Sequence, residues 1–421
     1  MTDTLKSVIA SCRDGYDPNA LPVAQAQTII GRYLPRVTAT EQVPLLQSLG
    51  RTLAHTIVSP LDVPAHDNAA MDGYAVRGGD LQPGGTTLKR IGESFAGRPF
   101  KGRIGVGECV RIMTGAVMPP GADTVVIQEA CLETDGLVQI NAKPNIGDNR
   151  RFAGEDLARG KPALMAGTLI GSAELGLIAS LGIASVAVVR RLRVAFFCTG
   201  DELASVGQPL ADGQIYDSSR YTVYAMLTRL GVDAIDLGVV RDDPAAIDAA
   251  LRDAAQRADA IISTGGVSVG EADFIRDLLA QLGEVVFWKI AMRPGRPMAF
   301  GRIGNAAFFG LPGNPVAVMV TFYHFVRHAL LAMQGRTNAP LPTLHAIAAQ
   351  PLRKKPGRTE YQRGIVARGA DGRWHARLTG QQGSGVLRSM VEANCFIVLE
   401  HDTGDIAQGE PVMVMLFEGL T

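Results

Sequence analysis

The strongest constraint on the fold is a regular alternation of short apolar runs and amphipathic stretches between residues 191 and 335. The apolar runs have the length of buried strands, and the stretches between them are long enough for helices. One such stretch opens with Asp242-Asp243-Pro244, and acidic residues and proline favour the first turn of a helix. Strands that alternate with helices predict a parallel, doubly wound α/β sheet. We expect strands at 193–197, 233–240, 260–263, 285–289 and 307–310, and helices at 217–231, from 242, at 271–282 and from 316.

The segments on either side of this alternation have a different sequence pattern. Residues 61–149 contain short β-type runs broken by Gly and Pro, as in a small β domain. The flanking segments contain two expected helices, VAQAQTIIGRYL and LLQSLGRTLAHTI, and a turn–helix–strand pattern at 167–189. After residue 340 β-type runs return, in YQRGIVAR, GSGVLRSM, NCFIVLE and EPVMVMLF. We therefore predict an α/β multidomain fold with a mixed N-terminal domain (19–60 plus 150–189), an inserted β domain (61–149), an α/β domain (190–336) and a β-barrel-like domain (337–421).

Composition argues against several classes of protein. The 421 residues carry 41 Lys and Arg against 41 Asp and Glu, so the basic excess typical of nucleic-acid-binding proteins is missing. With 47% hydrophobic and 19% charged residues, the chain is too apolar to be disordered. Five scattered cysteines without a C-x-x-C pair argue against a disulfide framework or a structural zinc site. The apolar stretch 175–189 is too short to span a membrane, and 303–326 is interrupted by a Pro-Gly-Asn-Pro turn. We expect a soluble, cytoplasmic protein.

Four loops follow the expected parallel strands, and ligands of open α/β sheets bind outside the carboxyl ends of such strands. The loops begin at Thr199, Asp242, Thr264 and Leu311. The third loop is the most specific, because its paired glycines let backbone N–H groups close on an oxyanion ahead of a helix N-terminus. It is not a Walker A loop, since no Gly-Lys-Ser/Thr follows. Its candidate ligand-binding residues are Gly265, Gly266, Ser268 and Gly270.

The same edge of the sheet collects charged side chains. Glu202, Asp242 and Asp273 supply carboxylates, and Mg²⁺ is usually held by one or two carboxylates together with phosphate and water. Lys289 and Arg293 supply cations for an anionic substrate. Taken singly, these features are also typical of a plain turn, helix caps and solvated surface residues. Together they indicate chemistry on a phosphate ester, an anhydride or another oxyanion, but no particular reaction.

Two further runs stand outside this segment. Asp72 lies in DNAAMDGYAV and Thr114 in RIMTGA, where a β-turn and an ordinary loop are the simpler interpretations. The cysteines are expected to be packing residues. His324 and His328 are spaced i, i+4, but without nearby acidic ligands they are expected to be structural.

Seven motifs in one order carry a resemblance to a known family. They are DNAAMDGYAV, RIMTGA, PPGADTVV, GEDL, STGGVSVGEADF, MRPGRPMAFG and GLPGNPVA. Together they resemble the molybdopterin molybdenumtransferases, bacterial relatives of the gephyrin E domain, and the resemblance runs from about residue 20 to 420. It implies the last step of molybdenum cofactor synthesis, in which adenylylated molybdopterin and molybdate react with the help of Mg²⁺ and AMP is released. It also implies a homodimer whose cleft lies between the α/β domain of one subunit and the β insertion of the other.

The resemblance also implies roles for single residues. Asp72 and Thr114 match positions that the partner subunit brings to the cleft, and Asp156 in GEDL matches a position important for activity. The resemblance gives catalytic and metal-binding roles to Glu202, Asp242 and Asp273. Lys289 matches a lysine near the anion site, whereas Arg293 stands where many relatives have lysine. The remaining candidate substrate-binding residues are Thr199, Pro312, Pro315, Arg363 in YQRG and Ser384 in QGSG.

Other functions remain open on this basis. One is a molybdopterin-binding scaffold without catalysis, which the intact acidic residues disfavour. Another is a molybdopterin adenylyltransferase of the same fold, which the extra β domains disfavour. Tungstate and molybdate are nearly the same size, so the sequence does not distinguish them. The expected partners are a second subunit, with handover contacts to the adenylyltransferase and to apo-molybdoenzymes, and neither nucleic acid nor membrane.

Overall fold

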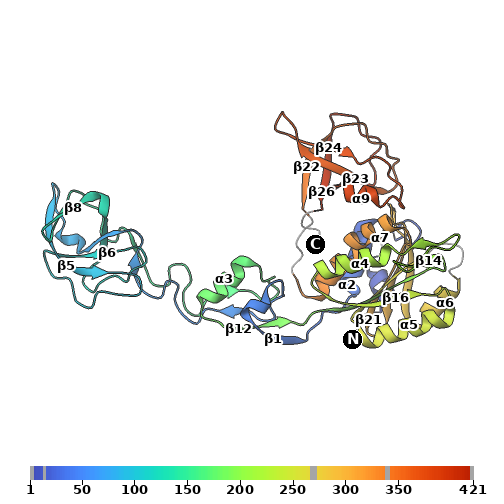
Figure 1. The fold of residues 1–421 in the computed structure, drawn as a ribbon, viewed down its shortest axis with the longest axis horizontal. Coiled ribbons are helices and arrows are strands. Elements are labelled where there is room, and N and C mark those ends of the chain that lie inside the picture. Colours follow the sequence, from blue (N-terminus) through green and yellow to red (C-terminus); the bar gives the residue numbers. More distant parts are fainter. Residues whose placement is uncertain (1–3, 13–15, 266–272, 337–341, 418–421) are drawn as a thin grey trace.

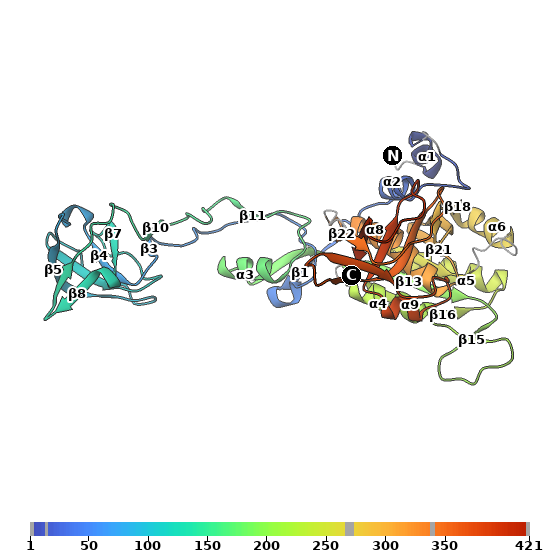
Figure 2. The ribbon, with the colours of Figure 1, turned by 90° about the horizontal axis from the view of Figure 1, so that it is seen from above.

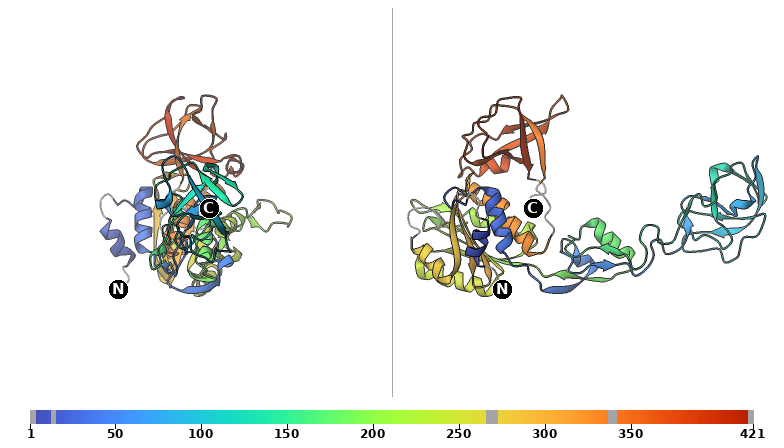
Figure 3. Two further views of the ribbon diagram at one scale, coloured as in Figure 1. Left: turned by 90° about the vertical axis from the view of Figure 1, so that its left-hand side faces the viewer. Right: turned by 180° about the vertical axis from the view of Figure 1, so that it is seen from behind.

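The computed structural model describes residues 4–12, 16–265, 273–336 and 342–417, with only the backbone given for 273–276. Three parts are visible in Figure 1: an extended arm (residues 40–189), an α/β unit (193–333) and a β-barrel (343–416). The arm leaves the α/β unit on one side, and the barrel sits on another side of that unit, as the other views also show (Figures 2 and 3). The multidomain α/β fold class predicted from the sequence is confirmed.

The central sheet of the α/β unit has six strands. Their order is β16 (Asp233–Val240), β13 (Arg193–Thr199), β17 (Ala260–Thr264), β21 (Ala306–Leu311), β20 (Pro297–Ile303) and β18 (Gly283–Lys289). Five strands run in the same direction, as predicted, but β20 is antiparallel to both of its neighbours. Only Gly304 and Asn305 separate β20 from β21, and such a short connection makes a hairpin because a parallel crossover needs many more residues.

Helices cover both faces of this sheet. α4 (Ser219–Arg229) and α7 (Pro315–Thr321) pack on one face, and α5 (Pro244–Arg257) and α6 (Asp273–Leu282) on the other. A hydrophobic core lies on each face of the sheet, and successive side chains of β13 pack into the two cores alternately, because a strand points alternate residues to opposite faces. Val194 and Phe196 join the core under α4, whereas Ala195 and Phe197 join the core under α5.

The last helix of the α/β unit is long and apolar. α7 continues through a π-helical turn, η4 (Phe322–Val326), into α8 (Arg327–Met333). By length and composition this helix could cross a membrane, but 83% of its most apolar window is buried inside the protein. It is a core helix. α2 (Val23–Tyr33) packs against η4 and α8, and α1 (Leu5–Ser11) packs against α2, so the N-terminal helices contact the α/β unit.

The base of the arm differs from the prediction. The helix expected over LLQSLGRTLAHTI does not form, and the chain has β1 (Thr40–Pro44) followed by a single 3₁₀ turn, η1 (Leu45–Ser48). Gly50 then adopts a φ of +74°, which ends the turn, and Thr52 forms a β-bridge with Leu169. Long-range pairing thus overrides local helix propensity. β12 (Ser185–Val189) pairs with β1, and α3 (Ser172–Ser180) precedes it, as the turn–helix–strand pattern at 167–189 predicted.

The far end of the arm is a small β structure. Its six-stranded sheet has the order β7 (Thr124–Ile127), β4 (Gly73–Val76), β6 (Glu108–Ile112), β5 (Thr86–Ser94), β9 (Leu137–Ile140) and β8 (Cys131–Thr134), with 3₁₀ turns η2 (Gly78–Asp80) and η3 (Gln128–Ala130). Two short ladders connect it to the base of the arm. They pair β2 (Ile57–Val58) with β11 (Pro162–Leu164) and β3 (Asn68–Ala69) with β10 (Arg150–Arg151).

The C-terminal β structure is a closed barrel, because β23 pairs with β25 as well as with β24. Its strands are β22 (Thr343–Ala348), β23 (Thr359–Arg368), β24 (Trp374–Leu378), β25 (Cys395–Leu399) and β26 (Pro411–Leu416). β19 (Met292–Arg293) adds to β23 and joins the barrel to the α/β unit. The β-type run expected over GSGVLRSM is wrong, since it contains a loop and α9 (Arg388–Glu392).

Candidate active site

The carboxyl ends of the five parallel strands meet at one edge of the central sheet. Because β13, β16, β17, β18 and β21 share a direction, the residues that follow them lie along this edge. The structure therefore brings together Thr199, Glu202, Asp242, Gly265, Lys289 and Pro312. Gly266, Ser268 and Gly270 lie outside the described residues. Asp273 is the first residue of α6, but its side chain also lies outside them.

Thr199 and Gly265 form a close pair at this edge. Thr199 is only 7% exposed, and within the described part of the chain its Oγ1 has no hydrogen-bond partner. Gly265 has a φ of +86°, and a Cβ added there would lie 2.9 Å from Thr199 Oγ1 and overlap its carbonyl oxygen. Only glycine fits this approach without strain. A buried hydroxyl without a partner is uncommon in proteins, so its place beside the strand ends marks a position where a ligand could bind.

Two of the three predicted metal-binding carboxylates are exposed at the edge. Glu202 folds back over Gly200, where an added Cβ would lie 2.5 Å from Glu202 Oε2. Asp242 lies two residues after the end of β16, and the next residue, Asp243, caps α5 by accepting from Ala246 N at 2.9 Å. Among the described side chains, no three His, Cys, Asp or Glu residues form a metal-binding group. The oxygen donors present still fit Mg²⁺, which commonly takes one or two carboxylates and fills its shell with water and substrate phosphate.

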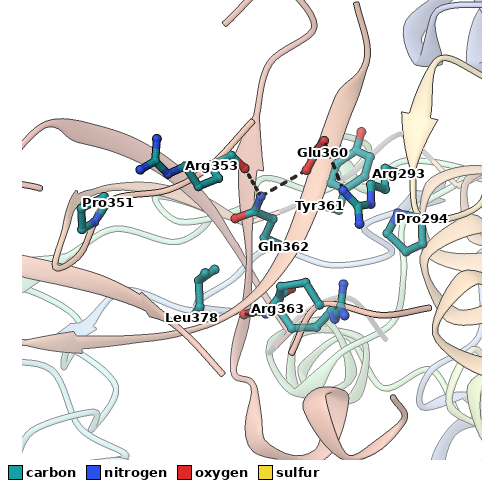
Figure 4. Close-up of a pocket in the computed structure, with 10 residues that line it drawn as sticks. Arg293, Pro294, Pro351, Arg353, Glu360, Tyr361, Gln362, Arg363 and Leu378 are labelled. Carbon is teal, nitrogen blue, oxygen red and sulfur yellow. Dashed lines mark hydrogen bonds and ion pairs between the residues drawn. The ribbon is translucent and has the colours of Figure 1, made fainter. Parts of the chain in front are cut away.

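A pocket of about 230 Å³ lies where the barrel meets the α/β unit. Figure 4 shows Arg293 and Pro294 on its α/β side, facing residues of β23. Arg293 is 54% exposed, and its guanidinium lies 4.0 Å from the buried Glu360 carboxylate. Lys289, at the end of β18, is half-buried. The residues around the pocket are Arg293, Pro294, Pro351, Arg353, Glu360, Tyr361, Gln362, Arg363, Leu378 and Gln382.

Arg363 is the most deeply buried charge at this pocket. Its side chain is held by Ser389 Oγ and Gly383 O, each at 3.0 Å, and the residue is 1% exposed. Burial, and then the charge of Arg293, lower the pKa of its guanidinium to about 10. No carboxylate of the described residues forms an ion pair with it. A buried cation without a counter-ion is costly, so the pocket favours an anionic ligand.

The loop that carries Pro312 and Pro315 is held from two sides. Ser384 O accepts a hydrogen bond from Val316 N at 3.1 Å, which ties the barrel to the first turn of α7. Ser219 Oγ donates to Gly313 O at 3.3 Å from the start of α4. Pro315 is the first residue of α7, where proline is favoured. The predicted substrate residue Ser384 is therefore adjacent to the strand-end loops.

The other predicted residues lie on the arm, away from this edge in the same chain (Figures 1 and 2). Asp72 Oδ1 accepts from both Thr114 N and Thr114 Oγ1 at 2.7 Å. These bonds, the backbone one first, lower the pKa of the Asp72 carboxyl. Asp156 is exposed, and its backbone N donates to Val63 O at 3.1 Å. Asp72 and Thr114 thus form a unit, which a single subunit does not bring to the sheet edge.

The sequence motifs did not single out two polar residues of the pocket. Glu360 is 3% exposed and accepts from Arg358 Nε at 2.9 Å and from Gln362 Nε2 at 3.1 Å. Within the described structure, Gln362 Oε1 is buried without a partner. The available signal was the predicted β-type run that begins at Tyr361, which contains Gln362 but not Glu360. In the structure both residues alternate with Tyr361 and Arg363, so they share a face of β23.

Comparisons with known proteins cover nearly the whole chain. Family models match as the MoeA N-terminal region (domain I and II) at residues 21–182, a probable molybdopterin binding domain at 195–332 and the MoeA C-terminal region (domain IV) at 345–417. The chain is 44% identical to the molybdopterin molybdenumtransferase of Haemophilus influenzae, over 95% of this chain and 99% of that one. It is 35% identical to the Nostoc protein of the same name, over 93% of each chain. The crystal structure of the molybdopterin biosynthesis MoeA protein from Pyrococcus horikoshii OT3 superimposes with a TM-score of 0.83 at 28% identity, covering 95% of this chain and all of that one. The chain therefore belongs to the molybdopterin molybdenumtransferase family.

Proposed function

We propose that this protein inserts molybdenum from molybdate into adenylylated molybdopterin and releases AMP, which gives molybdenum cofactor. The full-length similarity to curated molybdopterin molybdenumtransferases carries the enzyme class. The observation on the chain itself that best supports the substrates is the buried Arg363, a cation without a carboxylate partner among the described residues, at a pocket beside the strand-end loops. Molybdate and a pterin phosphate are both anions of the kind that such a guanidinium binds.

The residues at the edge suggest a division of roles. Lys289, Arg293 and Ser384 would hold molybdate together with the buried Arg363. The amides of the loop from Thr264 and the hydroxyl of Thr199 would hold the phosphate of the pterin. Glu202 or Asp273, with Asp242, would hold Mg²⁺, which neutralises charge on the adenylyl–phosphate linkage when bound. Binding both substrates at one edge turns a bimolecular reaction into one between positioned groups, and fixed cations stabilise the charge that develops.

The place of Asp72 and Thr114 on the arm supports a site shared between two subunits. In a homodimer, the arm of one subunit would bring this pair to the sheet edge of the other, as the family resemblance implies. The test mixes subunits of Asp72→Asn and Arg363→Met, each expected to have little activity alone at a molybdate concentration that half-saturates the wild-type chain. Sharing predicts recovered activity, because a mixed dimer then contains one site with neither change. Sites confined to single subunits predict no recovery.

Two alternatives are separated by measuring AMP release. The purified protein is given adenylylated molybdopterin and Mg²⁺, with and without molybdate. The proposal predicts release that depends on molybdate. Tight binding of the adenylylated pterin without release would favour a scaffold. Formation of adenylylated molybdopterin from ATP and molybdopterin would favour an adenylyltransferase, and the absence of all binding would contradict the assigned substrate.

A further inference from the structure

Arg220, on the first turn of α4, connects two segments that end at the candidate site. Its Nε lies 3.2 Å from Asp217 Oδ2, and its Nη1 lies 2.8 Å from Asp236 Oδ2. Asp217 ends the segment that begins at Glu202, and Asp236 lies on β16, the strand that leads to Asp242. One guanidinium thus spans the two segments that carry the exposed carboxylates of the edge.

The contact with Asp217 fixes the first segment. Asp217 is 1% exposed, and its Oδ1 also accepts from Arg220 N at 3.0 Å. A carboxylate buried to this extent is stable only when it is paired and hydrogen-bonded, so it stays with Arg220. Asp217 N donates to Ala204 O, and Ile215 N donates to Glu202 O at 2.9 Å. The backbone of Glu202 is therefore anchored, through a few hydrogen bonds, to the residue that Arg220 holds.

The contact with Asp236 fixes the second segment. Asp236 Oδ1 accepts from Gly238 N at 2.9 Å, and Gly238 has a φ of +79°. This turn coincides with a shift in the register of β16 against β13, between the pairs at Phe196 and Cys198. A bulge of this kind redirects the end of a strand, here the end that leads to Asp242. Arg220 holds the side chain that shapes it.

We propose that Arg220 is a positioning residue that sets the spacing between Glu202 and Asp242 for a divalent cation. The inference rests on the proposed function, in which these carboxylates hold Mg²⁺. A planar guanidinium donates in two directions at once and can join two carboxylates, whereas the ammonium of a lysine is a point charge on a flexible stem. Arg220 therefore acts through its partners, as residues behind metal ligands do.

The test is a titration of the full chain with Mn²⁺, followed by electron paramagnetic resonance, with Mn²⁺ standing in for Mg²⁺. Arg220→Lys keeps a charge beside Asp217 but cannot bridge to Asp236. Changes behind metal ligands commonly weaken metal binding about 10- to 100-fold, and we expect the half-saturating Mn²⁺ concentration to rise by about tenfold. Arg252→Lys is the matched control, because Arg252 on α5 also pairs with an aspartate, Asp248 at 2.8 Å, away from the edge.

A second variant keeps the inference testable if Arg220→Lys fails to fold. Asp236→Asn retains an acceptor for Gly238 N and removes one of the two charges that Arg220 joins, and it is expected to weaken Mn²⁺ binding by a similar factor. Wild-type affinity in the folded variants would overturn the inference and leave the proposed function intact. Failure of the wild-type chain itself to bind Mn²⁺ would instead overturn the metal site of the proposed function, and the inference with it.

Discussion

Replacing Arg363 with methionine separates anion binding from folding. The change removes hydrogen bonds to Ser389 Oγ and Gly383 O, which together are worth about 3–6 kcal/mol for a charged donor. It also removes the cost of burying a guanidinium without a carboxylate, which is several kcal/mol per ion. The two effects oppose each other, so we expect the free energy of unfolding to change by no more than about 2 kcal/mol.

The same change should weaken the binding of molybdate much more than it alters stability. A charge-assisted hydrogen bond to an oxyanion contributes about 1.5–3 kcal/mol, which corresponds to about 10- to 150-fold in half-saturating molybdate. The assay measures molybdate-dependent AMP release at saturating adenylylated pterin, beside thermal unfolding of the same samples. Arg377→Met is the control, since Arg377 is an exposed arginine on the neighbouring strand β24. If Arg363→Met leaves the half-saturating concentration of molybdate unchanged but lowers stability strongly, Arg363 is only a structural residue.

Three further changes test other parts of the site. Gly265→Ala should lower the free energy of unfolding by about 2–4 kcal/mol, because alanine is strained at a φ of +86° and its Cβ overlaps the Thr199 carbonyl. An unaltered melting temperature with normal activity would contradict this packing. Thr114→Val removes a hydroxyl that lowers the pKa of Asp72, so NMR titration should show that pKa rising toward the ordinary value of 3.8; no rise would mean that the bond is not formed in solution. In the wild-type chain the pKa of Asp72 is lower in the folded state than in the unfolded state, so its contribution to stability is fully present above pH 3.8. That contribution is lost only as the pH falls through the folded-state pKa. The pH dependence of activity between pH 6 and 8 should therefore not report the titration of Asp72. Glu202→Gln changes a proposed ligand itself, so the half-saturating Mg²⁺ concentration should rise by at least the roughly 10- to 100-fold that changes behind a ligand cost. The unfolding temperature should stay the same, and equal Mg²⁺ dependence would exclude Glu202 as a ligand.

Much of the α/β unit was predictable because its strands are buried apolar runs separated by capped helices. The strand at 233–240 is found with the same bounds, and Pro244 opens α5 as expected. The helix expected over 45–57 failed because its residues pair with segments more than a hundred positions away. Local propensity carries no information about such pairing. The antiparallel strand β20 was not among the expected strands, because a two-residue hairpin joins it to β21 and such a hairpin lies outside the strand–helix alternation.

The sequence could place some parts of the candidate site but not others. The strand-end residues could be placed together because parallel strands fix which edge their loops share. The pocket at the barrel could not, since it depends on how β23 packs beside β19, and no motif in the sequence specifies that contact. Arg363 and Asp72 were singled out by resemblance, whereas their burial and hydrogen bonds come only from the folded chain.

The proposed activity yields active molybdenum cofactor. The most direct measurement incubates the purified chain with adenylylated molybdopterin, Mg²⁺ and molybdate, and then adds a molybdoenzyme that lacks its cofactor. The recipient enzyme should gain activity in proportion to the AMP released, and neither effect should occur without molybdate. AMP release without activation of the recipient would show that the chain cleaves the adenylyl linkage but does not transfer molybdenum, which is incompatible with the proposed activity.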